Sequence, residues 1–345
     1  MLTNLPEPRT PDPAAAPPLR WGILAPGIIA GRMVDTLQTN TRQIITAVGS
    51  RSLERAQQFA GQWGVPKAYG SYEQLVADPD VDIIYVASPH SEHAAHAMLA
   101  LNAGKPALVE KAFTRNRAEA EQVVAAARAN HVPVMEAIMT RHTPALDVVR
   151  QLIDGGDLGE VDTILADHGQ NLTHVPRMVR PDLAGGALLD LGIYCVQLAV
   201  FLGGLPEKVV ASGALTDMGV DAHDSIALSG FPELPLALAA LHTTMLSQTP
   251  TVACVAGSAA RVELSSPFTT GGVALHYVTR DDEELFRPLP PITDSGALCY
   301  EAAHFACLVA DGALDSPVMP AEESVAIMGL LDEVRAQIGM KYPGE

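Results

Sequence analysis

The stretch Trp21-Gly22-Ile23-Leu24-Ala25-Pro26-Gly27-Ile28-Ile29-Ala30 sets the architecture of the first half of the chain. It ends an apolar run that predicts a strand over residues 19–25 and begins a run that predicts a helix over 28–37. A turn that binds a dinucleotide needs small residues for the tight turn, for approach to the pyrophosphate and for helix packing. Ala25, Gly27 and Ala30 occupy these three places, with Ala where the first glycine usually stands.

Taken alone, this stretch fits a cofactor turn and an ordinary β–α turn about equally well. Its place at the first strand of a βαβ series favours the cofactor turn. The helix that begins at Ile28 and Ile29 would present unpaired N–H groups and the positive end of its dipole to a pyrophosphate. We therefore expect Ala25, Gly27, Ile28 and Ile29 to contact the cofactor.

Short apolar runs alternate with amphipathic helices as far as residue 137. Strands are expected at 44–49, 82–87, 107–110 and 132–137, and helices at 52–61, 91–102 and 117–130. This alternation is typical of a parallel sheet. After about Pro144, helices at 146–153 and 186–201 are followed by consecutive strand-like runs from 209 to 278, and then by helices at 298–311 and 322–338, which indicates a largely antiparallel sheet.

The predicted fold class is therefore an α/β domain with a parallel, doubly wound sheet of the Rossmann type, followed by an α+β domain with an open, mainly antiparallel mixed sheet. The expected division is a disordered tail at 1–18, the first domain at 19–143 and the second at 144–345. A chain of 345 residues is long enough for two cores.

The formal net charge of −18 disfavours nucleic acid and anionic lipid as partners. The four cysteines have apolar neighbours and form no CxxC pair, which indicates reduced core thiols. The first 18 residues, rich in Pro and Ala, are expected to be a tail and not a signal peptide. No apolar run is expected to span a bilayer, so the sequence predicts a cytoplasmic protein.

The second strand ends in Gly49-Ser50-Arg51, without the acid that usually binds the ribose of NAD. Ser50 and Arg51 offer a hydroxyl and a guanidinium that suit a 2′-phosphate, although a solvated surface Arg51 would look the same. The sequence therefore favours NADP over NAD.

The third strand of the series ends in Ala87-Ser88-Pro89-His90, at the edge where ligands bind in such sheets. These residues and His93 are candidate cofactor contacts. His90, His93 and His96 resemble a metal-binding string, but they have no carboxylate or cysteine beside them, so a role in helix initiation and packing is favoured and no metal is expected. Glu110 and Lys111 follow the next strand at the same edge and are further candidates.

The reactive groups are expected from two segments. Lys111 is either a surface charge or a cation directed into the ligand crevice, and Asp190 and Tyr194 lie four residues apart on one helix face in an apolar segment. Hydride transfer at a carbonyl needs a group that gives or takes the proton of the oxygen. A tyrosine is a weak base unless a nearby Lys⁺ favours its phenolate, so Tyr194 with Lys111 could act as the acid/base, oriented by Asp190.

With these motifs, the chain resembles the Gfo/Idh/MocA oxidoreductases, and within them the branch of dimeric dihydrodiol dehydrogenase and glucose–fructose oxidoreductase. The matching segments cover Trp21–Ala30, Ala47–Ala60, Tyr85–Phe113, Met135–Pro144, Gly185–Val196 and Ser316–Glu345. The resemblance implies that Lys111 acts near the nicotinamide and that Asp190 and Tyr194 act at the substrate. It also implies substrate contacts for Arg141 and Arg177, and subunits paired as dimers through the open sheet.

Two departures from the pattern stand out. Ala112 replaces the proline after the Glu-Lys pair, which predicts a looser orientation of Lys111. Ile138, Met139 and His142 replace aromatic residues, which counts against an aromatic dihydrodiol as the substrate.

Three functions remain open at this point. The first is an NAD(P)-dependent dehydrogenase or reductase that acts on a CH–OH group of a sugar, polyol or trans-dihydrodiol. The second is a redox-neutral NAD-dependent glycosidase or lyase that oxidises its substrate transiently. The third is a non-catalytic regulatory protein that senses a nucleotide. Neither the physiological substrate nor the oligomeric state can be derived from the sequence.

Overall fold

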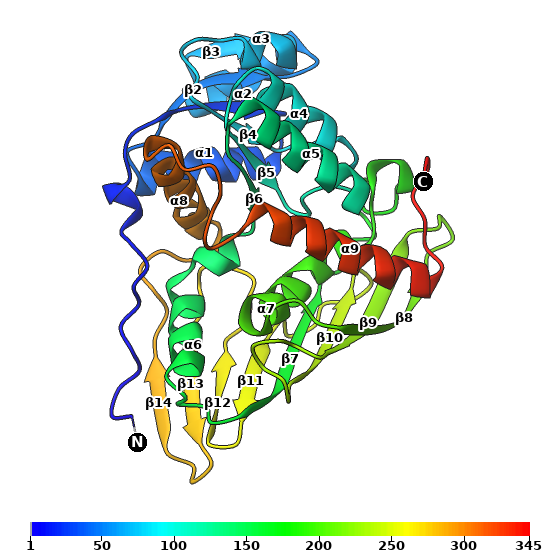
Figure 1. Cartoon of the computed structure of the whole chain (residues 1–345). Helices are drawn as coiled ribbons and strands as arrows, with labels where there is room; N and C mark the ends of the chain where they lie inside the picture. The colour runs from blue at the N-terminus through cyan, green and yellow to red at the C-terminus, as the bar shows by residue number, and fades with distance from the viewer. Residues whose placement is uncertain (1) are drawn as a thin grey trace. The chain divides into compact units, whose positions relative to one another are not determined.

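The computed structural model describes residues 2–345, which form two compact units (Figure 1). The parallel-sheet unit comprises Pro11–Met139 and Ser295–Met328, and the mixed-sheet unit comprises the residues up to Thr10, Thr140–Asp294 and Gly329–Glu345. The sequence placed everything after residue 143 in the second domain. Ser295–Met328 belongs instead to the first unit because the helix α8 (Leu298–Ala310) packs on α1 (Ile28–Asn40) and carries a buried apolar face.

The sheet of the parallel-sheet unit has the strand order β3-β2-β1-β4-β5-β6, and each neighbouring pair is parallel. This is the doubly wound order, and the direction of the order reverses between β1 and β4, where such folds bind ligands at the carboxyl edge. The strands are β1 Arg20–Leu24, β2 Ile44–Gly49, β3 Lys67–Tyr69, β4 Ile83–Val86, β5 Ala107–Glu110 and β6 Val134–Ala137.

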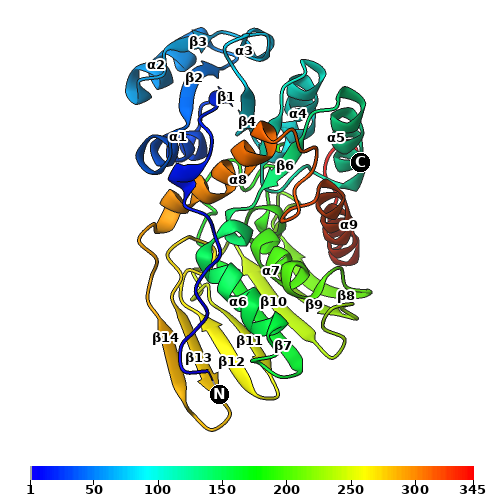
Figure 2. The same cartoon turned by 60° about the vertical axis from the view of Figure 1, so that its left-hand side comes forward.

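The helices of this unit lie on both faces of the sheet (Figure 2). They are α2 Leu53–Trp63, α3 Tyr72–Val76, α4 His93–Asn102 and α5 Arg117–Asn130, besides α1 and α8, with the short turns η1 Pro13–Ala15 and η2 His90–Glu92. The chain passes from one unit to the other within the short turns η3 Met139–His142 and η6 Asp294–Ala297. Ser52 caps α2, since its side chain accepts from the Arg55 N–H. The short elements β3 and α3 were not predicted.

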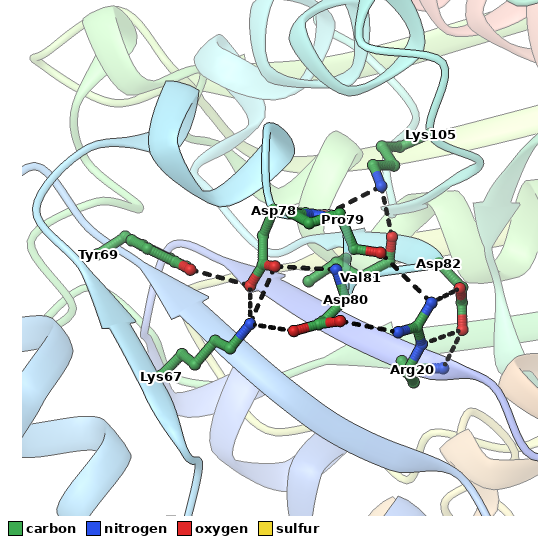
Figure 3. A network of polar contacts seen from close by, with 9 residues as sticks. All are labelled: Arg20, Lys67, Tyr69, Asp78, Pro79, Asp80, Val81, Asp82 and Lys105. Atoms are coloured by element: carbon green, nitrogen blue, oxygen red, sulfur yellow. Dashed lines mark hydrogen bonds and ion pairs between the residues drawn. The ribbon is translucent and has the colours of Figure 1, made fainter.

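The amino edge of this sheet is held by a network of charged side chains (Figure 3). Lys67 Nζ contacts Asp78 at 2.9 Å and Asp80 at 2.7 Å, while Arg20 pairs with Asp82 at 2.7 Å. Burial alone would raise the pKa of Asp78, but the N–H of Asp80, Lys67 and Tyr69 hold it below its ordinary value. The network joins β1, β3 and the start of β4 at the edge opposite the carboxyl ends of the strands.

The sheet of the mixed-sheet unit has eight strands in the order β14-β13-β12-β11-β7-β10-β9-β8. Among the described residues, β7–β10 is the one parallel pair of this sheet, so the sheet is mixed and mainly antiparallel, as predicted. The strands are β7 Val161–Gly169, β8 Lys208–Leu215, β9 Asp221–Ser229, β10 Leu238–Thr244, β11 Ala253–Gly257, β12 Ala260–Leu264, β13 Leu275–Thr279 and β14 Glu284–Arg287.

Helices cover one face of this sheet, and both views show α6 (Pro144–Asp154) and α7 (Ile193–Gly203) on that face. The helix α7 follows a π-helical turn, η5 (Leu188–Gly192), and both pack on β7 and β10. A short turn, η4 (Pro181–Leu183), precedes them, and α9 (Ala321–Ile338) ends in this unit. By length and composition Pro181–Gly203 could cross a membrane, contrary to expectation, but 89% of its most apolar window is buried inside the protein, as in a core helix.

The amino-terminal segment has defined contacts where the sequence predicted a disordered tail. Arg9 pairs with Asp147 at 2.7 Å, and Arg287 donates to the carbonyls of Leu5 and Pro6. Closer to β1, Arg42 donates to the carbonyls of residues 14–16. These contacts fix a segment whose prolines leave little backbone freedom to lose on folding.

Candidate active site

The turn between β1 and α1 leaves space for a ligand at the carboxyl edge. Ala25 has a φ of 73°, the left-handed conformation that a glycine would adopt without strain. Gly27 caps α1, and a Cβ placed on it would meet no atom within 4 Å. Ile28 is 82% exposed beside it, so the N–H groups that begin α1 face open space. Ala30 is buried, and Gly31 packs so closely that a Cβ on it would lie 2.8 Å from Trp63. The role of Gly31 was not predicted.

A cationic patch follows β2. Ser50 is buried and its hydroxyl accepts from the Ser52 N–H, whereas Arg51 is exposed. Burial raises the pKa of Tyr72, and Arg51 and Arg55 lie close enough to oppose that rise. The edge of Tyr72 also meets the His96 ring, with the ring centres 4.6 Å apart. Arg55 and Tyr72 were missed because they come from α2 and α3, and no local motif marks them.

Most of the segment that follows β4 is buried in the protein. Ala87, Ser88 and His90 are buried, and Ser88 Oγ makes no hydrogen bond within residues 2–345. His93 is fully buried with both ring nitrogens 2.8 Å from backbone carbonyls. Its ring is thus occupied by the protein backbone, as a packing role requires, and its predicted cofactor contact stays a prediction. The described residues hold no group of three His, Cys, Asp or Glu side chains placed to bind a metal.

Carboxylates surround the segment after β5. Glu110 is buried and accepts a hydrogen bond from the Tyr85 hydroxyl. Glu136 on β6 accepts the Phe113 N–H at 3.0 Å and the Ser324 hydroxyl at 3.0 Å. Glu301 on α8 is fully buried, and burial first, then the charges of Glu110 and Glu136, raises its pKa well above the ordinary value.

Glu136 lies in the matching segment Met135–Pro144 but was not singled out there, and Glu301 stands in none of the matching segments. Lys111 follows this strand at the carboxyl edge, and its carbonyl lies 3.2 Å from His90 Nε2. The peptide bond between Lys111 and Ala112 is cis.

In the mixed-sheet unit, Asp190 lies in the π-helical turn η5, and Tyr194 lies in the first turn of α7. Such π turns occur often at functional sites. Arg177 Nη2 donates to both carboxylate oxygens of Asp190 at 3.1 Å, and the Asp190 side chain is only 8% exposed. The structure thus brings together Asp190 and Arg177, two of the predicted substrate residues.

His168 on β7 is a neighbour of Tyr194 that the sequence did not indicate. The two rings meet edge to face with centres 5.3 Å apart. His168 Nδ1 lies 3.1 Å from the Leu191 carbonyl, and since a carbonyl only accepts, this nitrogen carries the proton. The Gln170 amide then donates to Nε2 at 2.9 Å. These two hydrogen bonds, to the Leu191 carbonyl and from the Gln170 amide, fix the orientation of the His168 ring against the Tyr194 ring.

The predicted substrate residue Arg141 is buried, and its guanidinium lies over the Phe201 ring of α7, 5.4 Å from the ring centre. This stacking holds η3 against α7. Ile138, Met139 and His142, which replace aromatic residues, are buried as well. The predicted contact of Arg141 with a substrate stays a prediction.

The turn before Asp190 is held from inside by a buried acid. Asp221 on β9 accepts the Leu188 N–H at 2.5 Å, and a Cβ on Gly186, whose φ is 118°, would lie 2.0 Å from Asp221 Oδ1. Burial first, and then the charge of Asp221, raises the pKa of Asp224 to about 9. Two buried carboxyl groups so close cannot both ionise, so the pair holds one proton at neutral pH.

The described residues fit a dinucleotide. Open space above Gly27 and the unsatisfied Ser88 Oγ both lie at the carboxyl edge where a doubly wound sheet binds such a molecule. On a doubly wound sheet with this opening turn, these features define a protein that binds a dinucleotide.

Comparison with known proteins assigns the family. The family model "Oxidoreductase family, NAD-binding Rossmann fold" matches residues 19–138, and the "GFO/IDH/MocA C-terminal domain" matches residues 147–263. The trans-1,2-dihydrobenzene-1,2-diol dehydrogenase of Homo sapiens is 40% identical over 335 residues, covering 94% of this chain and 98% of the relative. That of Bos taurus is 38% identical over 338 residues, with coverage of 94% and 98%. The chain belongs to the Gfo/Idh/MocA oxidoreductases, as its motifs indicated, and is an NAD(P)-dependent dehydrogenase or reductase.

Solved structures support the same fold and cofactor class. A 3-ketoreductase from Actinomadura kijaniata, in complex with NADP and TDP-benzene, has a TM-score of 0.82 at 27% identity and covers 93% of this chain and 98% of its own. An aldose-aldose oxidoreductase from Caulobacter crescentus, complexed with glycerol, has a TM-score of 0.82 at 24% identity, with coverage of 93% and 97%. The latter supports the fold alone.

Proposed function

We propose that the chain transfers a hydride between NADP and a CH–OH or carbonyl group of a sugar, a polyol or a trans-dihydrodiol. The observation that carries this proposal is the Arg177–Asp190 pair, in which a nearly buried carboxylate of η5 lies four residues before Tyr194 in the chain. The relatives that act on a dihydrodiol and on a keto group support the substrate class.

The bound nicotinamide supplies the hydride acceptor or donor. Tyr194 as the phenolate takes the proton of the substrate hydroxyl during oxidation, and as the phenol it returns a proton to the oxygen during reduction. The Lys111 ammonium stabilises negative charge on that oxygen, and Asp190, held by Arg177, accepts a hydrogen bond from the neighbouring hydroxyl of the substrate. The edge-on His168 ring limits the tilt of the phenol.

The decisive variant is Lys111→Met, which removes the cation and keeps the length of the side chain. We expect kcat to fall at least about 100-fold while the cofactor still binds, because the lysine acts on the reacting oxygen. Lys341→Met is the matched control, since Lys341 is exposed near the carboxyl terminus. Full activity of Lys111→Met would remove Lys111 from the mechanism.

The preference for NADP rests on the patch after β2. Arg51 and Arg55 lie near Tyr72, and no acid stands at the end of β2 to bind the two ribose hydroxyls of NAD. Two guanidinium groups suit a 2′-phosphate. A titration with NADPH and NADH, read by nicotinamide fluorescence, should show tighter binding of NADPH.

A panel of substrates separates the remaining possibilities. Sugars, polyols and an aromatic trans-dihydrodiol should be assayed by the absorbance of NADPH that is released during turnover. The proposal predicts stoichiometric NADPH. Cleavage of a glycoside without net NADPH would favour the redox-neutral reaction, and a cofactor-dependent protein partner without turnover would favour a regulatory role.

The open face of the mixed sheet supports a homodimer. The strand registers place one residue of each strand in a single row on the face that the helices leave uncovered, and Val210 and Phe286 at its ends are 67% and 66% exposed. The row is Val210, Ala227, Ala240, Leu165, Cys254, Glu263, His276 and Phe286. Apart from Glu263 and His276, which pair with each other, this row is apolar and suits a second copy of the chain. Light scattering should give a dimer for the wild type and a monomer for Leu165→Arg; a monomeric wild type would contradict it.

We also propose that the protein resides in a reducing compartment, the cytoplasm. All four cysteines are free thiols, and Cys195 and Cys299 are buried. Proteins of oxidising compartments more often pair such residues. Fractionation with an antibody against the chain would test this location, and recovery with secreted proteins would contradict it.

A further inference from the structure

We propose that His93 is a positioning residue for Lys111, because its ring bridges the backbone segments that follow β4 and β5. The inference rests on the proposed role of Lys111 in hydride transfer. His93 itself contacts neither substrate nor the reacting atoms in this scheme. It fixes the backbone from which the lysine side chain extends.

The bridge joins two segments that the sheet no longer holds. The pairing between β4 and β5 ends at Val86 and Val109. Beyond it, His93 Nε2 lies 2.8 Å from the Ser88 carbonyl, and Nδ1 lies 2.8 Å from the Ala112 carbonyl. The ring is fully buried, so water does not compete for these contacts.

A second imidazole holds the neighbouring carbonyl. His90 Nε2 lies 3.2 Å from the Lys111 carbonyl, and the rings of His90 and His93 meet edge to face with centres 5.5 Å apart. The carbonyls of two consecutive residues, Lys111 and Ala112, thus each lie within hydrogen-bond distance of a histidine, His90 in η2 and His93 at the start of α4. This arrangement gives Ala112 a fixed backbone without the ring of a proline.

The two contacts of His93 are not equivalent in any one state. A carbonyl only accepts hydrogen bonds, and a neutral imidazole has a single N–H. Burial lowers the pKa of His93 to about 4, so the ring is neutral at neutral pH and donates to one carbonyl at a time. The Nδ1–H form holds Ala112 beside the lysine, whereas the Nε2–H form holds Ser88.

Amide side chains can separate these two bonds. The nitrogen of His93→Asn can take the place of Nδ1, and that of His93→Gln can take the place of Nε2, whereas His93→Leu keeps the volume and neither donor. We expect kcat to fall about tenfold or more in His93→Leu, to recover largely in His93→Asn and to recover less in His93→Gln. The Kd for NADPH should stay within about threefold in all three.

Hydrogen exchange gives a readout that does not depend on turnover. In the cofactor-free protein, the peptide covering residues 108–116 should exchange faster in His93→Leu than in the wild type and be protected again in His93→Asn. His304→Leu is the control, since this ring in α8 is half-buried and contacts Ser316 Oγ at 2.8 Å, far along the chain from Lys111. His304→Leu should lower the free energy of unfolding and leave kcat and the exchange rate of residues 108–116 unchanged.

Two outcomes would overturn the inference. One is a kcat per folded molecule in His93→Leu equal to that of the wild type. The other is that His93→Asn and His93→Gln have the same kcat and the same exchange rate at residues 108–116. This second comparison decides the question if His93→Leu does not fold. Failure of the proposed function would look different, because Lys111→Met would then keep full activity while the exchange of residues 108–116 in His93→Leu was still fast.

Discussion

Replacing Gly186 by alanine should disrupt the turn that leads to Asp190 and Tyr194. A methyl group at this position would lie 2.0 Å from Asp221 Oδ1, and the φ of 118° lies outside the range that an alanine readily adopts. The carboxylate cannot retreat without losing the Leu188 N–H, which it accepts at 2.5 Å. The substitution therefore strains the backbone and breaks a charge-assisted hydrogen bond.

Both effects have known sizes. Backbone strain of this kind costs about 1–3 kcal/mol. A buried hydrogen bond to a charged group contributes about 1.5–3 kcal/mol. Gly186→Ala should thus lower the free energy of unfolding by about 3–6 kcal/mol, and Tm by roughly 6–12 °C at about 2 °C per kcal/mol. Because the turn carries Asp190, kcat per folded molecule should fall about tenfold or more.

Gly156→Ala is the matched control in the same unit. Gly156 also has a positive φ, of 73°, but a Cβ there meets no atom within 4 Å. It should cost only about 1–2 kcal/mol and leave kcat unchanged. Far-UV circular dichroism follows the whole chain, whereas the fluorescence of Trp21 and Trp63 follows the parallel-sheet unit. Equal losses of Tm in the two variants would refute the reasoning, because then the contact with Asp221 would add nothing.

Three further outcomes are expected. Arg51→Ala should raise the Kd for NADP about tenfold or more and leave that for NAD within about twofold, because only NADP has a 2′-phosphate; equal losses in a fluorescence titration would contradict it. Ala25→Gly should raise Tm by about 1 °C, because glycine adopts a φ of 73° without strain; a lower Tm would count against the strain. Asp224→Asn removes a group whose pKa is about 9 in the folded protein, so the wild type should lose stability relative to the variant as pH rises from about 4 to about 9, by at most about 1.4 kcal/mol per pH unit in denaturation curves. A constant difference across this range would mean that Asp224 ionises normally.

The parallel sheet could be predicted because its signals are local. Strands β2 and β5 and helix α5 have the predicted bounds to the residue, since each is a short periodic run with polar neighbours. The strand β7 was missed. It carries Asp162 and Asp167, and its place is decided by distant partners, among them the N–H groups of Thr251 and Val252, which Asp167 accepts.

The site could be predicted only in part, for the same reason. Lys111, Asp190 and Tyr194 stand in motifs, and Arg177 was expected at the substrate and is found on Asp190. His168 is a lone histidine on an unpredicted strand, so nothing near it in sequence marks it. The buried acids Glu136 and Glu301 come from elements that follow Lys111 by many residues, and the buried acid Asp221 comes from one that follows Asp190 by many residues. Only the folded chain brings each acid to the segment that it contacts.

These hidden acids act alike in the two units. Glu136 accepts the N–H of Phe113, two residues after Lys111, and Asp221 accepts the N–H of Leu188, two residues before Asp190. Each reactive group therefore extends from a turn whose backbone is held from inside by a carboxylate. Burying an acid is costly, as the raised pKa values of Glu301 and Asp224 show, yet a charge-assisted bond to a backbone N–H is about twice as strong as a neutral one. A turn fixed in this way keeps its geometry during turnover, because the holding bond joins a carboxylate and a backbone N–H that take no part in the reaction.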